Sequence, residues 1–422
     1  MPDEGILTRE DNEAAAAFVR DKARTNIRIF GDMLPETRAH AFAVAGIEEM
    51  RRLKQVQDAI ARVPEGGDWK EAREEIAAAL GDPEKNAARA ETVLRTNAFQ
   101  AYAAARHRSQ MGDTEVFPYL KYVTVGDDRV RDSHARLNGT ILRKDDPFWE
   151  THYPPWDWGC RCIAVELTEE MARDEQAEGT GELRDAGWSQ DYRAAHRGKD
   201  ESKDYQFRPG SLEIGLDSAA VKGYDKDGAP ILRYDEDTLR AFNERMEKAT
   251  VELPDGTTKN VREWMWEPVV ENAKGKLLAA ESKDGREHSI MLDRNSGAIL
   301  DEATGTKGAV RPNWKKAEGR DVAIYHNHPG GRPDLSPGDV AGLFNDGVSE
   351  VGAMTRWGGD MRVSGWTGNS DLKDEIRNLA GALDEASRTG DRATEAKIKA
   401  LWRAKFRTIL STGVLIEKGA RQ

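Results

Sequence analysis

Residues 325–339 read Tyr325-His-Asn-His-Pro-Gly-Gly-Arg-Pro-Asp-Leu-Ser-Pro-Gly-Asp339 and follow an apolar run that we predict to be a strand. Because residues two apart on a strand point to the same face, His326 and His328 can present two imidazoles to one metal ion. The Gly-Gly-Arg-Pro segment predicts a reversal of the chain. Ser336 then opens a helix as its N-cap, with proline at the first position and an acid in the first turn. This helix start would bring the Asp339 carboxylate back to the end of the strand.

Two imidazoles and one carboxylate form a ligand set that leaves a fourth zinc position for water. Ser-Pro-x-Asp alone is an ordinary helix start, and a lone His-x-His is often accidental. Their combination at this spacing predicts a metal site. The letters His-Asn-His do not indicate an HNH nuclease, because the residues of that motif are dispersed over a ββα unit and are consecutive here.

The region from about 251 to 370 resembles the JAMM (JAB/MPN) metalloprotease family, including its RadC and phage-borne JAB branches. His326, His328, Ser336 and Asp339 match without a gap the family pattern of His-x-His, seven residues, Ser, two residues and Asp. The resemblance implies an α/β domain of JAMM/JAB-like, cytidine-deaminase-like fold. It also implies that His326, His328 and Asp339 hold Zn²⁺, and that Ser336 helps to stabilise the oxyanion of a tetrahedral intermediate.

The same resemblance implies a glutamate from an earlier strand as general base, since a carboxylate near the metal can take a proton from water. The candidates are Glu287, which begins a predicted strand leading into a hairpin, and Glu281. We favour Glu287 because of this position. The alternative for either residue is a solvated carboxylate at a turn.

A second group of short motifs lies in the first 170 residues and resembles the Mu F-like minor head proteins of tailed phages, the phage head morphogenesis family. The resemblance covers about residues 10–170. It implies a protein present in few copies per virion, in the head interior or near the portal, after synthesis in the host cytoplasm. The implied partners are portal and capsid proteins, with packaged DNA as a further possibility. The motifs occupy residues 91–97, 101–106, 127–134, 137–140, 146–149, 153–155 and 159–162.

His134, Cys160 and Cys162 are candidates for a second metal site or a structural cluster, because thiolate and imidazole are zinc ligands. His152 or Asp132 could supply a fourth ligand, although the spacing matches no standard zinc finger. The alternative is two partly buried thiols in a polar loop, since free cysteine often behaves as a small hydrophobe.

The composition excludes some classes of protein. The net charge of −12 argues against a chain-wide electrostatic grip on DNA or on an anionic membrane. No signal-peptide pattern and no run of about 18 apolar residues occur, so we expect a soluble protein with no membrane partner. The chain has two cysteines with one residue between them, which fits a reducing compartment.

The pattern along the chain predicts a multidomain protein. We expect a mostly helical head-morphogenesis domain with a small β region at 1–175, a polar linker at 176–250, the JAMM-like α/β domain at 251–370 and a terminal helical hairpin at 371–422. Apolar spacing predicts about four helices between 12 and 107, including the stretch 39–47. Predicted strands are 119–125, 163–167, 277–280, 289–292, 298–300 and 322–325, with a hairpin turn at 295–297.

We therefore expect a phage or prophage minor head protein that carries a zinc-dependent peptidase or isopeptidase, acting on a virion or host protein. The alternative is a purely structural minor head protein whose JAMM-like fold is inactive. A nucleic-acid role like that suggested for RadC relatives is a third possibility, against which the acidic net charge counts.

Overall fold

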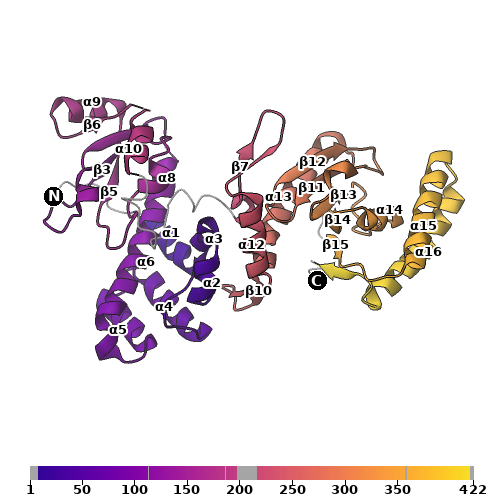
Figure 1. Cartoon of the computed structure of the whole chain (residues 1–422), viewed down its shortest axis with the longest axis horizontal. Coiled ribbons are helices and arrows are strands. Elements are labelled where there is room, and N and C mark those ends of the chain that lie inside the picture. The colour runs from indigo at the N-terminus through magenta and orange to yellow at the C-terminus, as the bar shows by residue number, and fades with distance from the viewer. Residues whose placement is uncertain (1–7, 113, 186, 197–215, 357–358, 419–422) are drawn as a thin grey trace. The chain divides into compact units, whose positions relative to one another are not determined.

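The computed structural model describes residues 8–112, 114–185, 187–196, 216–356 and 359–418 (Figure 1). The chain divides into two compact units, and we describe each by itself. The N-terminal unit comprises residues 1–216 and 244–264, and the C-terminal unit comprises residues 217–243 and 265–422. These boundaries differ from the expected ones, because the segment 244–264 belongs to the first unit. The multidomain organisation expected from the sequence is confirmed.

Helices that pack around one apolar core form the first part of the N-terminal unit. Leu53, Ile60, Ile76 and Leu94 are fully buried in this core. The predicted breaks are present: one helix ends before Pro64, and another begins with Pro83 at its first position. The helices are α1 (Arg9–Arg20), α2 (Ile27–Asp32), α3 (Pro35–Ala39), α4 (Met50–Arg62), α5 (Trp69–Ala79) and α6 (Pro83–Met111).

The prediction that 39–47 is helical was wrong. Ala41–Phe42 form strand β2, which pairs in parallel with β1 (Ala23–Arg24). Strand β1 also pairs with β9 (Thr250–Glu252), and β10 (Thr258–Asn260) completes a small sheet. Pairing with a strand elsewhere in the sequence decides the conformation of Ala41–Phe42, although the apolar residues around them recur at helical spacing.

The second part of the N-terminal unit is a four-stranded sheet with a cover of aromatic side chains. The strand order is β5-β3-β4-β6, with β3 and β5 confirming two predicted strands. Tyr122, Phe148, Trp149, Tyr153 and Trp156 are buried together, whereas Trp158 is exposed. The elements are β3 (Tyr119–Val123), α7 (Asp132–Ala135), β4 (Thr140–Arg143), α8 (Trp149–His152), β5 (Ile163–Leu167), α9 (Glu169–Ala177), β6 (Glu182–Leu183) and α10 (Trp188–His196).

Much of the expected polar linker at 176–250 has regular structure. Its described part contains η1 (Leu216–Ser218), the hairpin of β7 (Val221–Tyr224) and β8 (Pro230–Leu232), and helix α12 (Glu236–Met246). Leu239 and Phe242, spaced at one helical turn, are buried in α12 although the surrounding composition is polar. The charged run 199–204 lies outside the described residues.

A six-stranded mixed sheet forms the centre of the C-terminal unit (Figure 1). Its order is β12-β11-β13-β14-β15-β16, and only β13 and β14 run parallel within it. The predicted hairpin turn between β11 and β12 is confirmed, with Gly297 at φ 73°. The strands are β11 (His288–Asp293), β12 (Ile299–Thr304), β13 (Val322–Asn327), β14 (Val348–Met354), β15 (Met361–Ser364) and β16 (Ile416–Lys418).

Helix α13 (Val261–Asp284) covers one face of this sheet, and its residues from Met265 on belong to the C-terminal unit. Trp266, Ala273 and Leu277 pack at helical spacing against Ala323 and Tyr325. The prediction of a strand at 277–280 was therefore wrong. A short apolar run does not distinguish a strand from one turn of a buried helix.

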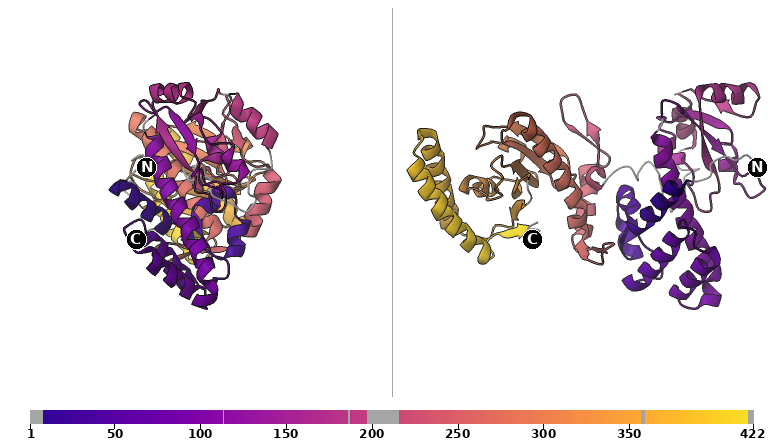
Figure 2. Two further views of the ribbon diagram at one scale, coloured as in Figure 1. Left: turned by 90° about the vertical axis from the view of Figure 1, so that its left-hand side faces the viewer. Right: turned by 180° about the vertical axis from the view of Figure 1, so that it is seen from behind.

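The other face of the sheet is covered by short helices and by the predicted terminal hairpin. The hairpin helices α15 (Ser370–Thr389) and α16 (Arg392–Ser411) lie side by side (Figure 2), and Gly390 between them adopts φ 74°. Trp402 and Phe406 share one buried cluster with Ile324 of β13, so the hairpin contributes to the core of this unit. The short elements are η2 (Trp314–Lys316), α14 (Pro337–Ala341) and η3 (Gly342–Phe344). Among the described helices, none combines the length and apolar character that a membrane span requires.

Candidate metal centre

Strand β13 and the start of helix α14 bring His326, His328 and Asp339 together, as the spacing predicted. One donor atom of each residue lies within 4.8 Å of those of the other two. The two Nε2 atoms of His326 and His328 are 2.9 Å apart, and Nε2 of His326 is 3.3 Å from Oδ1 of Asp339. Donors held about 2.0–2.1 Å from a tetrahedral zinc ion stand about 3.3 Å apart, so the three residues fit such an ion.

Local hydrogen bonds orient these donors. Asp339 Oδ2 accepts from the Ser336 backbone N–H at 2.6 Å, and Ser336 Oγ accepts from the Asp339 N–H at 3.2 Å. This capping box fixes the helix start and leaves Oδ1 facing the imidazoles. His328 Nδ1 donates to the Arg332 carbonyl at 2.7 Å, which leaves the lone pair of Nε2 available to a metal.

Burial and mutual charge shift the pKa values of the group. Burial opposes ionisation of Asp339, but the positive charges of His326 and His328 outweigh it and lower the pKa of this carboxyl. Burial likewise opposes the charged form of His326, while Asp339 and Glu287 act more strongly and raise its pKa. Burial and the neighbouring His326 lower the pKa of His328. The three side chains therefore interact electrostatically as one group.

Glu287 lies on the same face of the sheet as His326. Ser289 of β11 pairs directly with His326 of β13, and side chains directly opposite in an antiparallel pair share a face. Glu287 is two residues before Ser289 and so points to that face as well. Burial raises the pKa of Glu287 to about 7, with His326 lowering it and Asp339 raising it.

The hydroxyl of Ser289 is a further polar group at this position that the sequence did not reveal. The residue is buried, and its Oγ has no hydrogen-bond partner in the described part of the chain. A buried polar atom without a partner is costly, and a bound ion or water is one common explanation. This orphaned oxygen beside His326 agrees with a site that holds a metal.

Glu281, the second candidate base, lies on the opposite side of the sheet. It belongs to helix α13 and accepts from Asn327 Nδ2 at 3.1 Å. Asn327 stands between the two histidines in sequence and therefore points away from them. Arg356 also forms an ion pair with Glu281 at 3.6 Å.

The second candidate group is also assembled, in the N-terminal unit. His134 Nδ1 lies 3.6 Å from Cys160 Sγ and 3.5 Å from Cys162 Sγ, and all three residues are buried. A hydrogen bond from the Cys160 thiol lowers the pKa of Cys162 to about 5 and raises that of Cys160. Neither His152 nor Asp132 belongs to this group of converging donors.

Tyr122 and Trp156 complete the surroundings of His134, and sequence reasoning did not assign them to it. The Tyr122 oxygen is 3.1 Å from Nδ1 of His134 and accepts from Trp156 Nε1 at 2.8 Å. The indole of Trp156 stacks on the imidazole, with ring centroids 4.0 Å apart. The aromatic richness of residues 149–158 is the sequence signal that could have indicated such a contact.

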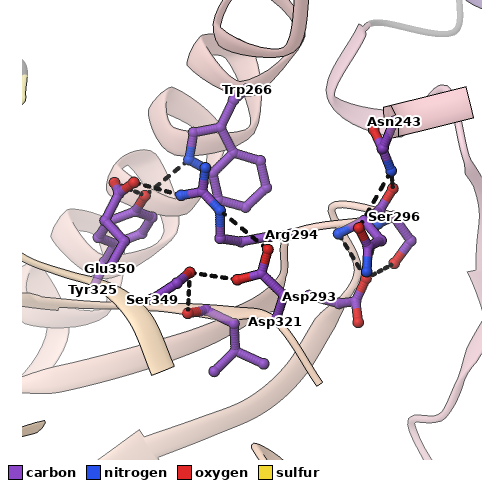
Figure 3. A network of polar contacts seen from close by, with 11 residues as sticks. Asn243, Trp266, Asp293, Arg294, Ser296, Asp321, Tyr325, Ser349 and Glu350 are labelled. Atoms are coloured by element: carbon purple, nitrogen blue, oxygen red, sulfur yellow. Dashed lines mark hydrogen bonds and ion pairs between the residues drawn. The ribbon is translucent and has the colours of Figure 1, made fainter. Parts of the chain in front are cut away.

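Sequence reasoning also missed a polar network on the α13 face of the C-terminal sheet (Figure 3). Glu350 is fully buried and accepts from the Tyr325 hydroxyl, while Arg294 forms an ion pair with it. Trp266 Nε1 donates to the Tyr325 oxygen at 3.1 Å. Because Tyr325 directly precedes His326, this network anchors the strand that carries the candidate ligands.

Comparison with known proteins supports the resemblance of the first part of the chain. Residues 54–165 match the family described as Phage Mu protein F like protein. This Mu F-like region includes His134 and both cysteines. The histidines of the C-terminal unit lie outside it.

Two curated relatives are similar to the chain. The Mu-like prophage FluMu F protein of Haemophilus influenzae is 48% identical over 105 residues, which are 24% of this chain and 24% of that protein. The putative capsid assembly protein F of Escherichia phage Mu is 29% identical over 247 residues, 49% of this chain and 56% of that protein. The chain thus spans about half or less of the length of these relatives. No solved structure matches the chain.

Proposed function

We propose that the chain is a head-morphogenesis protein whose C-terminal unit carries a zinc-dependent peptidase or isopeptidase of the JAMM type. The observation that carries the hydrolase is the convergence of His326, His328 and Asp339 on the face of the sheet to which Glu287 also points. The head-morphogenesis role is supported by the Mu F-like region and by the similarity to the putative capsid assembly protein F of Escherichia phage Mu.

The ligand set suits Zn²⁺, with two imidazole nitrogens and one carboxylate oxygen as protein donors. Zinc held by these residues would supply Lewis acidity toward an amide carbonyl and toward water. Glu287 takes a proton from water and can return it to the leaving amine, since its buried carboxylate lies beside the ligand group. The Ser336 hydroxyl accepts from the Asp339 N–H and can still donate its own proton to a developing oxyanion.

The partners and location follow from the head-morphogenesis part of the proposal. Portal and capsid proteins are the proposed partners, in the head interior or near the portal of a virion. The substrate of the hydrolase would be a virion protein during assembly or a host protein after delivery. Packaged DNA is a weaker candidate, because the net charge of −12 opposes extended contact with phosphates.

The test combines metal analysis with a cleavage screen on the full chain. Zinc is measured by elemental mass spectrometry in the wild type and in the His326→Ala/His328→Ala double variant, both with intact cysteines. Cleavage of a library of quenched fluorescent peptides and isopeptides is measured by the increase in fluorescence, and mass spectrometry identifies the products. We expect the double variant to lose one zinc ion per chain and all cleavage. Equal zinc content in the two proteins would contradict the proposal.

A second candidate function is a structural head protein whose C-terminal unit holds zinc without turnover. The capping box supports this structural candidate, because Ser336 and Asp339 satisfy each other's backbone groups and stabilise the helix start. Loss of one zinc in the double variant, together with no cleavage by the zinc-loaded wild type, would support this candidate over the hydrolase.

A further inference from the structure

The Mu F-like region brings His134, Cys160 and Cys162 together from two separate segments. His134 lies in the short helix α7, and the cysteines lie just before strand β5. Arg161 stands between the cysteines and makes a bidentate ion pair with Asp127, both bonds being 2.6 Å long. Because Arg161 is turned toward Asp127, its two neighbours are held with their thiols toward the imidazole.

The distances within the group agree with those around a tetrahedral zinc ion. Sulfur about 2.3 Å and nitrogen about 2.0–2.1 Å from zinc stand about 3.5 Å apart along an edge of the tetrahedron. The two observed edges from His134 Nδ1, to Cys160 Sγ and Cys162 Sγ, are 3.6 and 3.5 Å. Both thiols thus converge on one imidazole nitrogen.

The surroundings provide the outer contacts that metal ligands commonly have. The stacked indole of Trp156 fixes the plane of the His134 ring, and the Tyr122 hydroxyl closes another side of the group. At the second ring nitrogen, Nε2, Arg131 Nη2 lies at 3.3 Å and the Asp157 carboxylate at 3.9 Å, and Arg131 and Asp157 form an ion pair at 3.1 Å.

Charge balance also favours a divalent cation. A divalent cation held by a neutral imidazole and two thiolates would form a buried group with no net charge, and it would favour deprotonation of both thiols. His134 is only 2% exposed, and both cysteines are buried, so compensation by solvent is small.

We propose that His134, Cys160 and Cys162 bind Zn²⁺ in a structural centre of the Mu F-like region, with the Tyr122 hydroxyl donating a hydrogen bond to the Cys162 thiolate. The centre ties helix α7 to the segment before β5 and so holds the aromatic loop in place. It is independent of the metal centre in the C-terminal unit, and it does not depend on hydrolase activity.

The first test uses Co²⁺ as a probe of the thiolates in the full-length protein, prepared under reducing conditions. Only the N-terminal group contains sulfur, since Cys160 and Cys162 are the two cysteines of the chain. We expect a thiolate-to-cobalt charge-transfer band in the wild type and in the His326→Ala/His328→Ala variant. This band would be absent from a Cys160→Ser/Cys162→Ser variant. A wild type that takes up Co²⁺ without this band would overturn the proposal.

A second test counts zinc by elemental mass spectrometry and does not depend on folding of the cysteine variant. In the His326→Ala/His328→Ala variant, whose cysteines are intact, we expect thiol labelling to be slow until a strong chelator removes the zinc, and one zinc ion to be released as two thiols become reactive. Rapid labelling of both thiols before chelation, or a Cys160–Cys162 disulfide in freshly purified protein, would overturn the proposal. Failure of the C-terminal hydrolase would leave both results unchanged, so the two proposals fail separately.

Discussion

The Tyr325 hydroxyl donates a hydrogen bond of 2.5 Å to the buried carboxylate of Glu350 (Figure 3). Tyr325 directly precedes His326, the first candidate zinc ligand. The same carboxylate is paired with Arg294, and Arg362 lies 3.6 Å from it. Tyr325 faces helix α13, whereas His326 faces the opposite side of the sheet. One face of strand β13 therefore carries a buried structural network and the other face the candidate chemistry.

Replacement of Glu350 by Gln is expected to lower the free energy of unfolding of the C-terminal unit by about 3 kcal/mol. The substitution keeps the shape but removes a buried negative charge from beside Arg362, which is buried, and Arg294, which is half-buried. Tyr325→Phe removes one hydroxyl and should cost less, about 1–2 kcal/mol. Urea denaturation of the full chain checks both values, with the exposed ion-pair variant Glu385→Gln as control. A loss below about 1 kcal/mol for Glu350→Gln would contradict the structural role of the network.

Glu287→Gln and Glu281→Gln form a matched pair that separates the two candidate bases. We expect Glu287→Gln to keep its zinc and to lose activity by a factor of about 10²–10⁴, because the amide cannot accept a proton. Glu281→Gln should keep full activity, since Glu281 contacts Asn327 and Arg356 on the other side of the sheet. The measurement is kcat on any peptide that the screen identifies, with zinc content determined on the same samples. A reversal of the two phenotypes would place the base in helix α13.

The convergence of His326, His328 and Asp339 could be predicted from the sequence because it depends on local rules. Alternation on a strand places His326 and His328 on one face, and a helix cap returns Asp339 to them. The choice between Glu287 and Glu281 could not be made in this way. It depends on which face of the sheet helix α13 covers, and the segment 277–280 was itself predicted to be a strand.

Most of the structure that could not be predicted from the sequence depends on contacts between residues far apart in the chain. Arg24, which is 2% exposed, donates to Gln57 and to Glu252, and the latter contact joins segments 228 residues apart. No periodicity within either segment indicates that 250–260 would complete a sheet with β1. The convergence of Tyr122 and Trp156 on His134 is likewise a tertiary property, although the residue types that form the cluster were visible.

Tyr122→Phe is expected to weaken metal binding at the N-terminal group without abolishing it. The Tyr122 hydroxyl hydrogen-bonds with the Cys162 sulfur, and loss of an outer contact of a metal ligand typically reduces metal affinity about 10–100-fold. Tyr119→Phe, on the same strand but facing the other side, serves as the control. Competition with a chromophoric chelator in the His326→Ala/His328→Ala background isolates this site. Equal affinities in all three proteins would show that the hydroxyl does not support the metal.

The buried Lys22 makes the stability of the N-terminal unit depend on pH. Burial lowers the pKa of Lys22 from 10.5 to about 7, and its Nζ lies 4.0 Å from the Phe18 ring centroid. The unfolded chain binds this proton below pH 10.5, whereas the folded chain binds it only below about 7. The buried lysine therefore does not lower the free energy of unfolding above pH 10.5. The loss of stability grows as the pH falls from 10.5 to about 7, and it is constant below about pH 7.

Lys22→Met keeps the apolar stem and removes the charge, so it should raise the free energy of unfolding at pH 7 by about 3 kcal/mol. The gain should shrink steadily toward pH 10, because both states of the wild type then approach the neutral amine. Urea denaturation at several pH values between 7 and 10 measures this convergence, with the exposed Lys70→Met as control. A gain that stays constant across this range would assign the effect to packing rather than to the buried charge. A loss of stability at pH 7 would mean that the ammonium group is satisfied in the folded chain.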